Sequence, residues 1–198
     1  MKLTTYTGKH FDYNNISPDS IDIKDITHAL PRINRFIGHS SRAYSVAEHT
    51  LCCLDIAKTK GFSTRLQLLT LIHDFPEAYT GDCPTPLKVL LPEFKVIEGK
   101  VEHALYQHLG IEPPTEDEHA WVKCVDITML AIEMRDLTLH NHEEYVGDYT
   151  FKDILETPSF KIKRGNKPTE YFLQYLLHKS FTELMKSYRE EMESNEEV

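Results

Sequence analysis

The chain has 198 residues and a mass of 23.0 kDa, which is enough for one compact domain with a full hydrophobic core. Its net charge of −9 disfavours a nucleic acid polymer as partner, because binding along a phosphate backbone requires a broad basic surface. No apolar run approaches the roughly 20 residues that cross a bilayer, and neither a secretory signal nor a cysteine framework is evident. We therefore expect a cytoplasmic protein without a membrane partner.

The first half of the chain predicts helices after an irregular start. Residues 1–18 contain scattered glycine, asparagine and proline, which favour an irregular or short hairpin lead-in. A short helix is expected from about residue 19 to Leu30, where Pro31 interrupts it. Ser41 is expected to cap a helix that continues to about Lys60, because apolar residues recur there at helical spacing. Another helix follows Ser63.

The second half predicts further helices and one long polar segment. Thr85 is expected to cap a short helix to about Leu91, and two longer helices should cover roughly residues 95–109 and 116–140. Residues 141–168 are polar and interrupted by glycine and proline, which indicates a loop or flap. A last helix is expected at about 169–188, followed by an acidic frayed tail at 189–198. The pattern predicts an all-α fold in one domain, residues 1–198.

Ionisable residues follow the apolar run at 68–72, where an ordinary core helix would stay apolar. They are His73, Asp74, Glu77 and Asp82. Asp126 similarly falls on the apolar face of the long helix predicted around it. A buried carboxylate without a partner is costly, so such a group is normally neutralised, paired or bound to a cation.

Three helices could deliver the side chains that such a cation needs, namely His49, His73, Asp74 and Asp126. This mixed nitrogen and oxygen set suits one divalent transition metal, such as zinc, manganese, cobalt or iron. A metal ion of this kind lowers the pKa of water and polarises a phosphoryl oxygen, as hydrolysis of a phosphate ester requires. Glu77 is then a candidate base, and Asp82 could orient the water or protonate the leaving oxygen.

Each of these residues also has an ordinary structural interpretation. His49 could be a hydrogen-bonded core residue, and Asp74 and Asp82 could cap turns. Asp126 could pair with Lys123 on the surface. Each alternative is the commoner one when it is considered alone, but all of them together require several coincidences.

The motifs that contain these residues resemble those of the HD-domain superfamily of metal-dependent phosphohydrolases, which is named for an adjacent His-Asp pair. The similarity is carried by "RFIGHSSRAYSVAEHT", "LIHDFPEAYTGDCPTPLK" and "VDITMLAIEMRDL". It is greatest to the bacterial 5'-deoxynucleotidases and the phage dATP triphosphohydrolases. The resemblance implies an HD-domain helical bundle with His49, His73, Asp74 and Asp126 as metal ligands and with Glu77 and Asp82 as catalytic acidic residues.

The resemblance also implies a set of substrate contacts. Arg35 matches the arginine that holds the phosphate, and Lys88 is a second candidate contact. Arg32 could add a positive charge, and His39 could be a further ligand or a hydrogen-bond partner of the substrate. The substrate itself could bring additional magnesium or cobalt.

The implied activity is hydrolysis of a nucleotide, either of a deoxynucleoside triphosphate or of a 5'-deoxynucleoside monophosphate. A triphosphate needs more basic side chains, which Arg32, Arg42 or the basic run at 161–167 could supply, unless that run is solvated surface. The alternatives are a non-catalytic nucleotide-binding regulatory module and a hydrolase of an alarmone or another signalling nucleotide. We also expect a homo-oligomer, with the aromatic C-terminal helix as a candidate interface.

Overall fold

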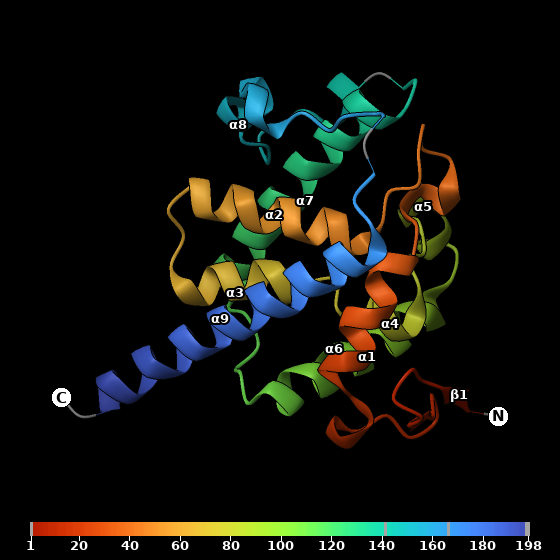
Figure 1. Ribbon diagram of the computed structural model, residues 1–198, viewed down its shortest axis with the longest axis vertical. Coiled ribbons are helices and arrows are strands. Elements are labelled where there is room, and N and C mark those ends of the chain that lie inside the picture. Colours follow the sequence, from red (N-terminus) through yellow and green to blue (C-terminus); the bar gives the residue numbers. More distant parts are fainter. Residues whose placement is uncertain (1, 141, 166, 197–198) are drawn as a thin grey trace.

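The computed structural model describes residues 2–140, 142–165 and 167–196 (Figure 1). The chain is mostly helical and has one short antiparallel hairpin, in which β1 (Leu3–Thr4) pairs with β2 (His10–Phe11). This confirms the predicted all-α bundle with a hairpin lead-in. No helix in the described part of the chain is long and apolar enough to cross a membrane.

The α-helices form one bundle and differ widely in length. They are α1 (Ile23–Ala29), α2 (Val46–Thr59), α3 (Thr64–Ile72), α4 (Glu77–Thr80), α5 (Thr85–Lys88), α6 (Pro92–Leu109), α7 (Glu116–Leu137), α8 (Lys152–Glu156) and α9 (Glu170–Glu196). Short 3-10 turns connect several of them, namely η1 (Pro18–Ser20), η2 (Leu30–Arg32), η3 (Arg35–Gly38), η4 (His142–Tyr145) and η5 (Pro158–Phe160).

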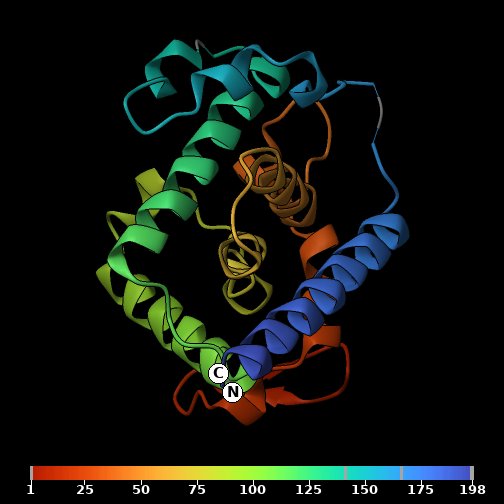
Figure 2. The same ribbon diagram turned by 90° about the vertical axis from the view of Figure 1, so that its left-hand side faces the viewer.

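The centre of the bundle is the pair of helices α2 and α3. Both contact α7 and both contact α9, which lie on opposite sides of the central pair in Figure 2. Some helix ends follow directly from the sequence. The Ser63 hydroxyl accepts the Leu66 N–H at the start of α3, and Gly110, with φ 65°, ends α6 in the left-handed conformation that favours glycine.

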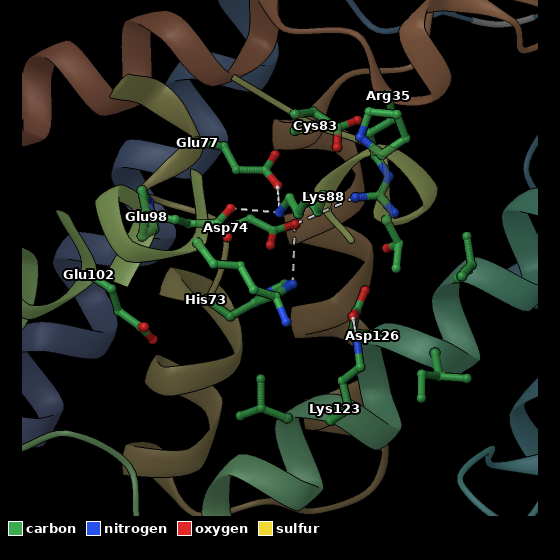
Figure 3. A pocket seen from close by; sticks show the side chains of 18 of the residues that line it. Arg35, His73, Asp74, Glu77, Cys83, Lys88, Glu98, Glu102, Lys123 and Asp126 are labelled. Atoms are coloured by element: carbon green, nitrogen blue, oxygen red, sulfur yellow. Dashed lines mark hydrogen bonds and ion pairs between the residues drawn. The ribbon is translucent and has the colours of Figure 1, made fainter. Parts of the chain in front are cut away.

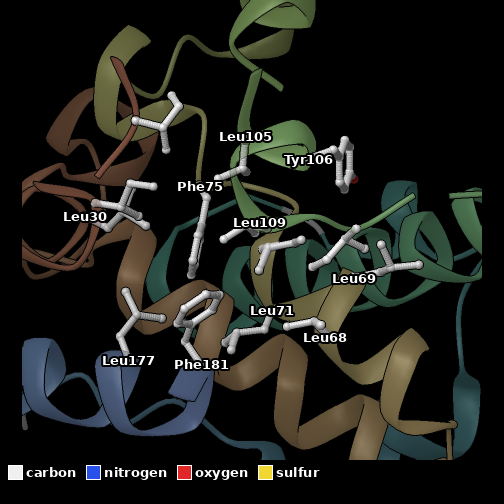
Figure 4. Close-up of a cluster of buried hydrophobic side chains, with 14 of the residues drawn as sticks. Leu30, Leu68, Leu69, Leu71, Phe75, Leu105, Tyr106, Leu109, Leu177 and Phe181 are labelled. Atoms are coloured by element: carbon white, nitrogen blue, oxygen red, sulfur yellow. The ribbon is translucent and has the colours of Figure 1, made fainter. Parts of the chain in front are cut away.

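The main hydrophobic core lies between α3, α6 and α9 and extends to α1 and α2 (Figure 4). Phe75, which directly follows the His-Asp pair, is fully buried in it. Its ring centroid lies 5.8 Å from that of Phe181 in α9. The turn that carries the His-Asp pair is therefore anchored to the core by the next residue along the chain.

A second buried cluster joins α2 and α7 to the segment that the sequence suggested to be a loop or flap. Ile154 of α8 is buried in this cluster, and Arg135 of α7 donates to the carbonyl oxygens of Leu155 and Phe160 at 2.7 and 3.2 Å. The Asp136 carboxylate accepts the Ile162 N–H at 2.8 Å. The segment expected to be a loop or flap, residues 141–168, thus contains the short helix α8 and docks on α7.

Several predicted helix boundaries also need correction. The second helix starts at Val46 with Ser45 as its cap, not at Ser41, because the backbone N–H of Arg35 bonds to the Tyr44 carbonyl and keeps the preceding residues extended. Thr85 is the first residue of α5 and not its cap, α6 starts earlier than expected, and α5 and α7 end before the predicted residues.

The acidic tail was the largest error of this kind. The structure extends α9 to Glu196, where the sequence indicated a frayed end after Tyr188. Two contacts support the extra turns: Thr64 donates to the Glu191 carboxylate at 2.5 Å, and Lys186 pairs with Glu190 one turn later at 3.7 Å. Residues 197 and 198 lie outside the described residues.

Candidate active site

A cavity of about 1110 Å³ opens between η3, the α3–α6 segments and α7 (Figure 3). Most of the residues that the sequence singled out line it, namely Arg35, His73, Asp74, Glu77, Asp82, Lys88 and Asp126. His49 is fully buried beneath them, with its ring centroid 5.5 Å from that of His73. Residues far apart in the sequence thus meet around one space.

The His-Asp pair occupies the break between two helices. His73 is the C-cap of α3, and Pro76 begins the next helical turn, so that Glu77 is the first residue of α4. The Glu77 N–H bonds to the Asp74 carbonyl at 3.1 Å. Pro76 therefore starts a new helix, and Glu77 is not placed by one continuous helix shared with His73.

His49 and His73 each direct one ring nitrogen toward the same point. The Nδ1 of His73 lies 2.7 Å from the Thr70 carbonyl, which only accepts, so this nitrogen carries the proton and Nε2 carries the lone pair. That Nε2 is buried and has no hydrogen-bond partner among the residues that the structure describes. His49 is held in the same way, because its Nδ1 lies 2.5 Å from the Glu133 carboxylate. Imidazole groups fixed like this are typical metal ligands.

The free nitrogens and two carboxylates surround one small volume. His49 Nε2 lies 3.4 Å from both Asp74 Oδ2 and Asp126 Oδ1, and His73 Nε2 lies 3.3 Å from Asp74 Oδ2. Donors that share one ion at about 2.0–2.2 Å lie roughly 3.0–3.5 Å from each other, so these separations fit a single divalent ion. The residues present therefore fit the predicted metal centre.

Cys53 also reaches this point, although the sequence did not single it out. It lies one helical turn after His49 on α2, and its Sγ is 3.4 Å from His49 Nε2. The nitrogen and sulfur atoms of His49, Cys53 and His73 all lie within 4.8 Å of one another. Burial raises the pKa of the Cys53 thiol to about 11, which keeps it protonated and able to donate weakly to His49.

The electrostatics of the cluster attract positive charge. Burial disfavours ionisation of Asp126, yet the two histidines and Lys123 lower its pKa well below the usual value. The pKa of His73 is raised although burial opposes this, because Asp74 lies beside it. Asp126 also pairs with Lys123 through Oδ2 at 2.7 Å, so the surface pairing considered from sequence coexists with its contact to His49.

Arg35 enters the cavity from an unusual backbone turn. In η3 the next two residues, Phe36 and Ile37, have φ values of 58° and 52°, a left-handed conformation that costs about 1–2 kcal/mol per non-glycine residue. The Arg35 guanidinium contacts Glu133 at 3.1 and 3.2 Å and lies 3.6 Å from Asp74. Despite its burial these carboxylates raise the pKa of Arg35, so it stays charged.

Glu77 and Lys88 form the opposite wall of the cavity. Lys88 Nζ lies 2.6 Å from the Glu98 carboxylate and 4.0 Å from Glu77 Oε1. The other oxygen of Glu77 is buried, and no described residue forms a hydrogen bond with it. Burial, reinforced by the charges of Asp74 and Asp82, raises the pKa of Glu77 well above its usual value. Burial also raises the pKa of Asp82.

Two predicted contacts do not line the cavity. Arg32 donates to the His28 carbonyl and lies 3.5 Å from Glu170 of α9. His39 is exposed next to η3. Arg42, considered as a further donor, forms a two-pronged ion pair with the buried Glu48. The substrate roles of Arg32 and His39 therefore gain no support from their positions.

Glu133 and Glu98 were missed by reasoning from the sequence. Glu133 follows Asp126 by seven residues, which is two helical turns, and it interrupts an apolar stretch in the same way. That spacing was the available signal. Glu98 gives no such signal, because it lies in a helix that is charged on several sides.

Comparisons with known proteins agree with this geometry. The profile of the family described as 5'-deoxynucleotidase YfbR-like matches residues 31–181. The uncharacterized protein YfdR of Escherichia coli (strain K12) is 40% identical over 154 residues, covering 78% of this chain and 78% of that protein. The 5'-deoxynucleotidase YfbR of Escherichia coli O1:K1 / APEC is 26% identical over 178 residues, covering 81% and 76%.

A solved structure is also similar. It is the cyanophage S-2L HD phosphohydrolase DatZ bound to dA and one catalytic Zn²⁺ ion, with 22% identity and a TM-score of 0.44 over 82% of this chain and 95% of that chain.

The fold and the site together define a class of protein. A helical bundle that holds an adjacent His-Asp pair against a histidine and an aspartate from two further helices is an HD domain, as the motifs predicted. The family profile covers well over half of the chain. The protein thus belongs to the HD phosphohydrolase superfamily and, within it, to the 5'-deoxynucleotidase YfbR-like family.

Proposed function

We propose that this protein hydrolyses the phosphate ester of 2'-deoxynucleoside 5'-monophosphates with the help of a divalent metal ion. The family description and the name of the relative YfbR support this substrate class. The observation that carries the choice of a monophosphate is the charge balance of the cavity, where carboxylates already neutralise most of the cations.

The cavity wall carries more acidic than basic side chains. Its cations are Arg35, Lys88, Lys95 and Lys123, and its carboxylates are Asp74, Glu77, Asp82, Glu98, Glu102, Asp126 and Glu144. Arg35, Lys88 and Lys123 each lie within 4 Å of a carboxylate. A bound divalent ion would share its two positive charges between the carboxylates that hold it and the phosphate group, so a monophosphate is the smaller demand on the site. A triphosphate would add about two more negative charges in an already acidic cavity.

The basic run that was considered as an extra phosphate contact lies elsewhere. The side chain of Arg164 donates to the carbonyl oxygens of Asp136 and Thr138, and the carbonyl of Lys163 accepts from Arg42. Lys161 lines a separate cavity of about 380 Å³. None of the basic side chains described in this run lines the large cavity, which favours the smaller phosphate group.

The binding chemistry follows from the fixed groups of the site. His49, His73, Asp74 and Asp126 would hold the metal ion, which supplies polarisation of the phosphoryl group and acidification of water. Arg35 faces the same volume with its Nη1 near Asp74, so it can donate to a phosphoryl oxygen placed there. Lys88 approaches from the other wall with a single point charge.

Glu77 is the group best placed to exchange a proton with the reacting atoms. It lines the cavity beside Asp74, and one of its oxygens has no hydrogen-bond partner in the described part of the chain. Burial raises its pKa well above the usual value, which favours a carboxyl group that can take up and release a proton. Asp82 lines the same wall and can orient water or receive the proton in turn.

A substrate screen tests the proposal. The purified protein is incubated with manganese, cobalt, zinc or magnesium and with each common mono- or triphosphate nucleotide, and the products are separated. Release of inorganic phosphate from deoxynucleoside monophosphates is the expected result. Release of inorganic triphosphate from a deoxynucleoside triphosphate would replace the proposal by the triphosphohydrolase alternative. Binding without turnover under all conditions would favour the regulatory module.

We further propose that the chain forms a homo-oligomer through the first turns of α9. Three aromatic side chains there are more than half exposed, namely Tyr171, Phe172 and Tyr175. Exposed aromatic groups of this kind are typical of interfaces. Light scattering should give a mass above that of one chain, and replacement of all three by serine should give the monomer. A monomeric wild-type protein would contradict this proposal.

A further inference from the structure

Glu133 of α7 lies between His49, a proposed metal ligand, and Arg35, the proposed phosphate contact. It is fully buried, and each of its carboxylate oxygens has a different partner. Oε1 accepts from His49 Nδ1 at 2.5 Å. Oε2 accepts from Arg35 Nε at 3.2 Å and lies 3.1 Å from Nη2. One carboxylate therefore holds both a proposed metal ligand and the proposed phosphate contact.

The bond to His49 determines which ring nitrogen faces the metal position. Since the carboxylate only accepts, it keeps the proton on Nδ1 and leaves Nε2 directed at Asp74 and Asp126. Outer carboxylates that hold a ligating histidine in this manner raise its basicity and typically contribute 10- to 100-fold to metal affinity.

The bonds to Arg35 orient the guanidinium in the same way. Glu133 binds the Nε edge of the fork, so that Nη1 is the nitrogen left on the Asp74 side, at 3.6 Å from its carboxylate. The side chain of Arg35 is only 12% exposed, which limits its freedom further. A planar group fixed along one edge can meet a phosphoryl oxygen in only one orientation.

We propose that Glu133 is a positioning residue that links the metal-binding and phosphate-binding halves of the site. This inference rests on the proposed function for the role of Arg35, whereas its metal part depends only on His49. Both halves should respond to a single substitution at Glu133, although Glu133 does not line the cavity and does not reach the substrate.

Glu133→Gln is the most direct test, because glutamine keeps the shape but has only one accepting oxygen for two sets of donors. We expect the affinity for cobalt, measured by competition with a chromophoric chelator, to fall about 10- to 100-fold. The absorption spectrum of bound cobalt should change as His49 reorients. The KM for the nucleotide should rise, since Arg35 loses its orientation as well.

Glu48→Gln is the matched control. Glu48 is a buried glutamate that pairs with Arg42 at 2.9 Å and does not contact the cavity. The substitution removes the same charge from a comparable ion pair, so it should lower thermal stability while leaving cobalt affinity and spectrum unchanged. Equal cobalt affinities of the Glu133→Gln variant and the wild type would overturn the proposal.

Two further variants keep the inference testable if Glu133→Gln does not fold. Glu133→Asp retains the charge but is one methylene shorter, so it cannot reach both partners and should still weaken either cobalt or phosphate binding. Arg35→Gln should weaken binding of inorganic phosphate but not of cobalt, because Glu133 still holds His49. Loss of cobalt affinity in Arg35→Gln, or undiminished binding of both probes in Glu133→Asp, would contradict the linking role.

These measurements separate the inference from the proposed function. Cobalt and inorganic phosphate are bound without turnover, so the result for Glu133 stands even if no deoxynucleotide is hydrolysed. If deoxynucleotides are hydrolysed but Glu133→Gln binds cobalt normally and keeps the wild-type KM, the proposed function survives and the linking role does not.

Discussion

Glu133 and Glu77 are two buried glutamates on opposite sides of one site, and their surroundings differ sharply. Both oxygens of Glu133 are bonded to cationic or N–H groups of the protein. Within the described part of the chain, Glu77 has one oxygen without a hydrogen-bond partner, and Lys88 lies 4.0 Å from its other oxygen. A carboxylate whose bonds are all satisfied can hold neighbours in place, whereas one with a free oxygen remains available for a proton.

The difference has an energetic side. An unpartnered buried carboxylate is unfavourable to folding, which is why burial raises the pKa of Glu77. Such a cost is typical of functional sites, where groups needed for the reaction often lower the free energy of unfolding. The two glutamates should therefore respond in opposite ways to the same isosteric substitution.

The largest effect is expected from removal of a metal ligand, because both glutamates matter only if the ion binds between them. His73→Ala removes a nitrogen that has no hydrogen-bond partner among the described residues. Phosphatase activity should fall to the background of the metal-free protein, and cobalt binding should be lost at micromolar concentrations. Activity near the wild-type level would show that the reaction does not use this site.

Glu77→Gln should reduce kcat by about 10²- to 10⁴-fold, the usual contribution of a group that transfers a proton. The variant should unfold at the same denaturant concentration as the wild type or at a higher one, because an unpartnered carboxylate is removed. A loss of stability with unchanged kcat would reverse the distinction between the two glutamates. Cobalt affinity serves as the control and should change little.

Glu133→Gln should lower the free energy of unfolding by about 3 kcal/mol, because it leaves the buried Arg35 with a weakened partner. Urea denaturation measures this value directly. The informative quantity is the difference between the free energies of unfolding of the Glu133→Gln and Glu77→Gln variants. If both variants had the same stability, the number of bonds to a buried carboxylate would not explain its role.

Much of this contrast could not be predicted from the sequence. The proposed ligands His49, His73, Asp74 and Asp126 could be singled out from the sequence, since polar groups on apolar helix faces need a partner and the motifs resemble a known superfamily. Glu133 looks like an ordinary helical glutamate until the fold places it against His49 on another helix. The surroundings of Glu77 could not be predicted either, because Pro76 starts a new helix and Lys88 and Glu98 reach the same wall from later segments.

The fold shows the same limit. Helix ends with local signals, such as Ser63 and Gly110, were found correctly. Ser45 was missed as a cap because Ser41 offers the same side chain, and the choice depends on the distant backbone bond between Arg35 and Tyr44. The helical tail of α9 is supported by the contact of Glu191 with Thr64 of α3, which a local sequence pattern cannot reveal.

Asp136 provides a smaller test on the same helix as Glu133, with a carboxylate that is paired but partly exposed. Burial opposes its ionisation, but the Arg135 guanidinium and the Ile162 N–H outweigh burial and lower its pKa. The resulting stability is present above the unfolded pKa of about 3.9 and is lost as the pH falls through the folded value. Asp136→Asn should cost about 2 kcal/mol at pH 7.

The deficit of Asp136→Asn relative to the wild type should shrink as the pH is lowered below about 4, since the wild-type carboxylate then becomes protonated as well. Thermal unfolding followed from pH 7 to pH 3 measures this. A deficit that does not depend on pH would mean that the charge of Asp136 is not the source of its contribution, and no deficit would mean that the segment docks on α7 through its apolar contacts alone.

The contact between Phe75 and Phe181 has a consequence for protein synthesis. The His-Asp pair is translated early, but the aromatic ring that buries its neighbour belongs to α9, which leaves the ribosome more than a hundred residues later. A nascent chain would carry every proposed ligand and still lack the support under the turn that presents two of them. Competence to capture an ion should thus arise late, when α9 emerges and packs onto the other helices.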